Sequence, residues 1–93
     1  MIKIEDKNIY RNGSKIGWIS DNDIWNQSGD KAGYYESNDI YDHNGTKIAY
    51  LDGSYIRMEN GDAPISMLDT NEHMSASGCS DIMKATVRVL LGG

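Results

Sequence analysis

Three pairs of an aromatic residue and a lysine are the strongest candidates for a functional site in this sequence. They are Tyr10 with Lys15, Trp25 with Lys31, and Tyr41 with Lys47. A ring beside an ammonium group can take part in cation–π attraction, so a set of such pairs could form a face for an acidic or carbohydrate-like ligand or for a partner. The competing interpretation is cross-strand packing, in which the lysine stem covers the ring. We favour packing, because repetition in repeat folds usually serves stability.

A nucleophilic or metal site has little support. Cys79 follows His73 by six residues, but a catalytic cysteine needs a lowered pKa and a positioned histidine, so an ordinary cysteine at a helix start is the better interpretation. Two histidines and one cysteine are too few for structural zinc. Residues 21–23 begin like a calcium loop, but Asn26 and Ala32 stand where that loop needs Gly and Glu. We therefore expect no metal, no cofactor and no enzymatic activity.

Composition restricts the classes of partner. The chain has 9 Lys plus Arg and 14 Asp plus Glu, a net charge of -5, which argues against nucleic-acid binding. No apolar run approaches the roughly 18 residues of a membrane span, and residues 1–6 are mixed and charged, so neither a membrane segment nor a signal peptide is expected. One cysteine excludes an internal disulfide and fits a cytoplasmic protein. The 93 residues predict one small domain.

A repeat of about 16 residues must position the aromatic–lysine pairs. Its clearest column is Gly13, Gly29, Gly45 and Gly61, and an Ile precedes each glycine at Ile9, Ile24, Ile40 and Ile56. Asn precedes the glycine in three of the four units, and Asn-Gly is a strong hairpin signal because both residues accept positive φ. The first unit is one residue shorter before its turn, which a change of turn type would absorb. The sequence therefore predicts a mainly β fold with four β-hairpins in residues 1–69.

Strand alternation predicts two faces for these hairpins. Behind the aromatic–lysine pairs, we expect Ile9 opposite Ile16, Ile24 opposite Ala32, and Ile40 opposite Ile48. The predicted core face carries these residues together with Trp18, Tyr34 and Tyr50. The opposite face would carry the aromatic–lysine pairs with Gly17, Gly33 and Ala49, whose small size indicates close backbone approach between neighbouring units. The pattern leaves open which face is buried at the axis of the repeat.

The repeat weakens in its fourth unit. Arg57 replaces the aromatic residue there and Pro64 stands where a ladder donor would be, which is typical of a terminal, capping unit. The pattern stops after Asp69. Residues 70–79 are polar and small, and we predict a linker there.

Residues 80–93 predict a short C-terminal helix, packed on the domain or on a partner. Ser80 is a suitable N-cap and Asp81 falls in the first turn. The apolar face of this helix would consist of Ile82, Ala85, Val89 and Leu90. A strand is the rival interpretation, because residues 86–89 alternate and are β-branched.

The unit Asp-Ile-Tyr-Asp-x-x-Gly-x-Lys-Ile-Gly-Tyr resembles the four-fold β-flower family of small bacterial proteins. The resemblance covers Ile4 to about Asp69. It implies four hairpin units around a pseudo-four-fold axis, and it implies little about activity. The hairpins are also similar, more weakly, to the aromatic hairpin repeats of choline- and cell-wall-binding modules, whose period is longer, near 20 residues.

We expect a non-enzymatic interaction module that binds a protein partner or a second copy of itself. An exposed apolar helix face would favour dimerisation. The alternative is a small-ligand-binding domain that uses the aromatic–lysine face.

Overall fold

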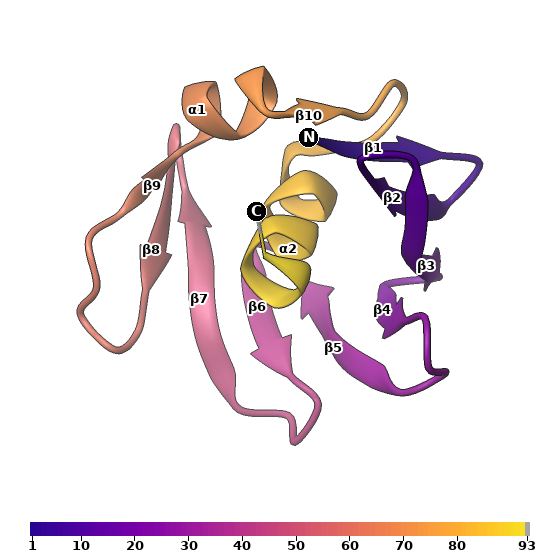
Figure 1. Cartoon of the computed structure of the whole chain (residues 1–93). Coiled ribbons are helices and arrows are strands. Elements are labelled where there is room, and N and C mark those ends of the chain that lie inside the picture. The colour runs from indigo at the N-terminus through magenta and orange to yellow at the C-terminus, as the bar shows by residue number, and fades with distance from the viewer. Residues whose placement is uncertain (93) are drawn as a thin grey trace.

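The computed structural model describes residues 1–92, in which ten strands form one sheet (Figure 1). The strands are β1 (Ile2–Glu5), β2 (Asn8–Arg11), β3 (Ser14–Ser20), β4 (Asp23–Asn26), β5 (Lys31–Glu36), β6 (Asp39–Asp42), β7 (Lys47–Asp52), β8 (Tyr55–Met58), β9 (Ile65–Ser66) and β10 (Met74–Ser75). The helices are α1 (Met67–Glu72) and α2 (Asp81–Leu91). Strands β1 to β9 are antiparallel neighbours in chain order, and β10 pairs in parallel with β1. The fold is mainly β with a short C-terminal helix, as predicted.

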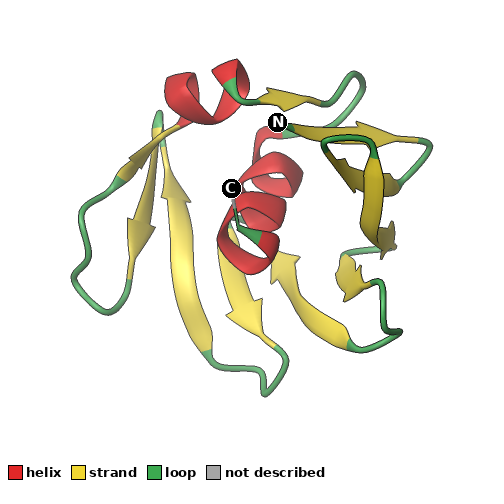
Figure 2. Ribbon diagram, viewed as in Figure 1, coloured by secondary structure: helices red, strands yellow, loops and turns green. Residues whose placement is uncertain are grey.

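The sheet curves around α2, and α1 lies across the opening between the edge strands β9 and β10 (Figures 1 and 2). Two apolar clusters fill the space between sheet and helix. The first joins Val87 of α2 to isoleucines of β1 to β4, and the second joins Ala85 of α2 to Ile40, Ala49 and Ile56. Since both clusters include α2, the helix is an integral part of the domain core.

The predicted hairpins and the pairing near their tips are confirmed. Tyr10 lies opposite Lys15, Trp25 opposite Lys31, and Tyr41 opposite Lys47. Asn12 and Gly13 both have positive φ, 50° and 86°, as a two-residue hairpin turn requires. The shorter first unit therefore differs from the others in its turn and keeps the pairing behind it.

A β-bulge behind the tip of each of the first three hairpins makes the prediction of the two faces wrong. Ile9 pairs with Gly17, Ile24 with Gly33, and Ile40 with Ala49, so one residue is left over in each second strand. The three extra residues are Ile16, Ala32 and Ile48. An extra residue reverses the alternation beyond it. As a result Gly17, Gly33 and Ala49 are buried, and Trp18, Tyr34 and Tyr50 move to the aromatic–lysine face.

The small residues do mark close backbone approach between units. A Cβ added at Gly17 would overlap the carbonyl oxygen of Trp25, and one added at Gly33 would overlap that of Tyr41. Gly33 also lies against Leu90 of α2. The small side chains therefore let the next unit and the helix come close to the second strand.

The segment predicted as a linker contains ordered elements instead. Ser66 caps α1 by accepting hydrogen bonds from the amides of Leu68 and Asp69, and Met74 pairs with Ile2 where β10 joins β1. These elements are only six and two residues long, so their periodicity is too short to stand out in the sequence. Pro64 immediately precedes the edge strand β9, as expected for a terminal unit.

The helical interpretation of the C-terminal segment is confirmed, and the strand alternative is wrong. The Ser80 side chain accepts a hydrogen bond from the amide of Met83, as an N-cap does. The predicted apolar face was too narrow, because Thr86 and Val87 are also fully buried. The reason is that the sheet surrounds α2 on more than one side.

Candidate functional site

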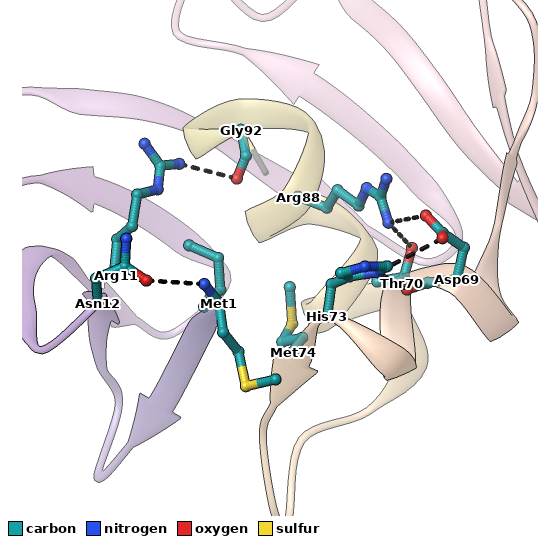
Figure 3. Close-up of a pocket in the computed structure, with 10 residues that line it drawn as sticks. Met1, Arg11, Asn12, Asp69, Thr70, His73, Met74, Arg88 and Gly92 are labelled. Atoms are coloured by element: carbon teal, nitrogen blue, oxygen red, sulfur yellow. Dashed lines mark hydrogen bonds and ion pairs between the residues drawn. The ribbon is translucent and has the colours of Figure 1, made fainter.

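A cavity of about 350 Å³ lies at the C-terminal end of α2, between α1 and the first hairpin (Figure 3). Its walls come from β1, β2 and the following turn, α1, β10 and α2. The lining residues are Met1, Ile2, Arg11, Asn12, Asp69, Thr70, His73, Met74, Arg88 and Gly92. Clefts that combine apolar walls with a few polar groups are typical of binding sites.

Arg11, at the end of β2, forms one side of the cavity. Its Nη2 donates hydrogen bonds to the carbonyl oxygens of Leu91, at 2.5 Å, and Gly92, at 3.1 Å. The last carbonyls of a helix have no partner within the helix and carry partial negative charge, so a guanidinium is well suited to this position. Arg11 therefore joins the first hairpin to the end of α2.

Arg88 forms the opposite side and joins α2 to α1. Its Nη1 lies 2.8 Å from Asp69 Oδ2 and donates to Thr70 Oγ1 at 3.1 Å. Thr70 is buried and donates to the Ser66 carbonyl at 3.0 Å. His73 Nδ1 lies 2.9 Å from the backbone oxygen of Asp69. The acidic group of the cavity is thus already paired with one of its two arginines.

The floor and rim of the cavity are apolar. Ile2 and Met74 lie side by side on the parallel strands β1 and β10. Met1 lines the cavity and is 67% exposed, and Leu68, which precedes the lining residue Asp69 on α1 but is not itself part of the lining, is 70% exposed. The Met1 nitrogen donates to Asn12 Oδ1 at 3.0 Å. This end of the molecule therefore presents apolar side chains next to charged ones.

Sequence reasoning missed this cavity entirely. Its residues come from positions 1–12, 69–74 and 88–92, and no spacing rule connects segments so far apart. Only the unpredicted elements α1 and β10 bring them together. The N-cap signal of Ser66 could have indicated α1.

The aromatic–lysine face lies on the side of the sheet away from α2. The rings form stacked pairs, Trp18 with Trp25 at 6.1 Å and Tyr34 with Tyr41 at 4.8 Å between centroids. Each lysine amine lies over the ring three residues further along its own strand. These contacts are Lys15 over Trp18 at 5.5 Å, Lys31 over Tyr34 at 4.7 Å, and Lys47 over Tyr50 at 4.8 Å. The bulge causes this, because residues three apart on a regular strand point to opposite faces.

Two of the three lysines on this face are already paired with carboxylates of the same face. Lys31 pairs with Asp23 and Lys47 with Asp39, each at 3.0 Å. The hydrogen bond to Asp39 raises the pKa of Lys47 above its usual value, and burial raises the pKa of Tyr41. The rings stack on one another, and two of the amines already hold carboxylates. Both observations favour the packing interpretation of the aromatic–lysine pairs, which are Tyr10, Lys15, Trp25, Lys31, Tyr41 and Lys47.

The apolar helix face lies inside the domain. Ala85 is fully buried, and Ile82, Val89 and Leu90 pack against the second core cluster. The helix thus packs on the sheet of its own chain.

Cys79 is expected to react slowly with alkylating agents. Burial raises the pKa of its thiol, and the nearby Lys84 only partly offsets this. The thiolate is the nucleophile, so a raised pKa lowers reactivity near neutral pH. At pH 8 we expect iodoacetamide to modify the native protein several-fold more slowly than the protein in urea, measured by mass spectrometry. Equal rates in the two conditions would contradict a shielded thiol.

Within residues 1–92, no three His, Cys, Asp or Glu side chains gather closely enough to hold a metal ion. In the same part of the chain, neither helix is long and apolar enough to cross a membrane. No family model, curated protein or solved structure matches this chain.

Proposed function

We propose that this chain is a non-enzymatic module that binds a protein partner at the cavity end of α2. The observation that carries the proposal is a charged cavity whose lining includes Met1, 67% exposed, beside a helix, α1, that carries the 70% exposed Leu68 next to the lining residue Asp69. Exposed apolar side chains next to a concave polar site are typical of interaction surfaces. A second copy of the chain is one form that the partner could take.

The aromatic–lysine face supports a ligand-binding role less well. A new anionic ligand there would have to displace Asp23 from Lys31 or Asp39 from Lys47. The stacked pairs also leave fewer ring faces open for a sugar. The cavity end is therefore the better candidate for the binding surface.

We also propose that the chain is a cytoplasmic relative of the four-fold β-flower proteins. The repetition of backbone contacts supports this kinship. The amides of Tyr35, Leu51 and Met67 donate to the carbonyls of Asn22, Asn38 and Ser54, at steps of 16 residues. The bulges recur at nearly the same spacing. The single cysteine fits a reducing compartment.

Leu68→Glu is expected to abolish partner binding without affecting the fold. Leu68 is exposed and lies in the first turn of α1, where an acidic residue is favourable. Affinity capture from an extract of the source organism, with quantitative mass spectrometry, would compare this variant with wild type. Light scattering at high micromolar concentration would test self-association in the same way.

Tyr55→Glu is the matched control, because Tyr55 is another exposed large apolar residue, on β8, at 46% exposure. We expect proteins captured by wild type to persist with Tyr55→Glu and to disappear with Leu68→Glu. If the captured set, or a dimer, survives Leu68→Glu and is lost with Tyr55→Glu, the binding surface is not at the cavity.

A further inference from the structure

The cavity has an excess of positive charge in an acidic protein. Arg11 and Arg88 line it together with a single carboxylate, that of Asp69, whereas the whole chain carries a net charge of -5. Asp69 pairs with Arg88, and the partners of Arg11 within the described residues are two backbone carbonyls. One guanidinium charge therefore faces no side-chain carboxylate among residues 1–92.

Both arginines keep donors that their contacts do not use. Arg11 makes its two hydrogen bonds through Nη2, and Arg88 makes its contacts with Asp69 and Thr70 through Nη1. A guanidinium has five N–H groups, so each arginine has further groups for an acceptor that enters the cavity. Arginine and carboxylate can match through two parallel hydrogen bonds. The existing contacts fix both side chains in place and lower the entropy lost on binding.

An apolar surface lies next to these cations. Figure 3 shows Arg11 and Arg88 on opposite sides of the cavity, with the side chains of Met1 and Met74 between them. Methionine side chains adapt to ligands of different shape. The site therefore combines an anion-binding edge with an apolar floor, in a volume of about 350 Å³.

We propose that this cavity binds an apolar group that ends in a carboxylate. The carboxylate would lie toward the arginines, and the apolar group would cover Ile2, Met74 and Met1. The C-terminal residue of a partner protein has this chemistry, and so does a free short-chain carboxylic acid. The inference rests on the proposed function, because it names what the same site recognises.

The test is a titration of the isotope-labelled full chain, followed by amide chemical shifts. The probes are a five-residue peptide ending in leucine with a free carboxylate, the same peptide as C-terminal amide, and hexanoate. We expect the free acid to shift the amides of Arg11, Thr70 and His73. It should also bind about tenfold more tightly than the amide, a difference of about 1.4 kcal/mol, because hydrogen bonds between a guanidinium and a carboxylate are stronger than those to a neutral amide. Hexanoate binding as tightly as the acid would identify a free acid as the ligand, whereas binding of the peptide alone would identify a chain terminus.

Asn12→Asp should weaken binding of the free acid several-fold, because it places a carboxylate in the cavity, against the Met1 ammonium, and so reduces the positive charge that attracts the acid. Asn44→Asp is the control, since Asn44 holds the same Asn-Gly position in the third unit and does not line the cavity. Thermal melts would show that both variants fold. Equal losses in the two variants, shifts confined to the aromatic–lysine face, or no shifts at millimolar acid would overturn the inference. Acid and amide binding equally well at the cavity would overturn the carboxylate inference alone and leave the proposed binding surface intact.

Discussion

Replacing Val87 with aspartate is expected to unfold the domain. Val87 is fully buried in the first core cluster, between α2 and the isoleucines of the first four strands. A carboxylate there would have no partner, and burying an unpaired charge costs several kcal/mol. Small domains have total stabilities of only about 5–15 kcal/mol. Circular dichroism should show no cooperative thermal transition, whereas Val87→Ala should melt cooperatively with a loss of roughly 2 kcal/mol.

Leu68→Glu provides the comparison for this effect. It also introduces a carboxylate into a helix, but at a side chain that is 70% exposed. We expect its melting temperature to stay within a few degrees of wild type, because exposed substitutions change stability by only about 0.5 kcal/mol. A cooperative transition of Val87→Asp near the wild-type temperature would mean that the sheet folds without α2.

The hairpins and the pairing near their tips could be predicted because they depend on local chemistry. Asn-Gly turns and the aromatic–lysine pairs lie within a few residues of each other, so the sequence contains both sides of each contact. The bulges could not be found in this way. Ile16 and Ile48 are as apolar as core residues. If they are taken as core residues of a regular strand, the alternation of side chains also assigns Trp18 and Tyr50 to the core. Only the backbone pairing reveals the extra residue.

The helix α2 and the cavity show a second limit of prediction from the sequence. A helix on the surface of a domain has one apolar face, and that assumption identified Ile82 and Ala85 but left out Val87. Apolar residues are distributed around most of the circumference of the helix in residues 82–91, and this pattern is typical of a helix enclosed by other elements. The cavity depends on where α1 and β10 meet the first hairpin, and contacts between such distant segments leave no periodic trace in one sequence.

The second large effect is expected at Gly33. Alanine there would place Cβ against the carbonyl oxygen of Tyr41 and 2.8 Å from Cδ1 of Leu90. The leucine can rotate, but the carbonyl belongs to the strand pairing of β5 and β6 and can move only if that pairing is distorted. We expect Gly33→Ala to lower the free energy of unfolding by about 3 kcal/mol, measured by urea denaturation.

Two other positions serve as controls, because they distinguish this steric overlap from the backbone strain that replacing a glycine can cause. Gly53 has a φ of 58° and nothing within 4 Å of an added Cβ, so Gly53→Ala should cost only about 1–2 kcal/mol, from left-handed strain. Ala49 occupies the position equivalent to Gly33 in the third unit, pairs with Ile40 and is fully buried. The same bulge therefore holds a buried Cβ in the third unit. If Gly33→Ala proves no worse than Gly53→Ala, the strands at the second unit can separate as well, and the close packing of β5 against α2 does not depend on glycine.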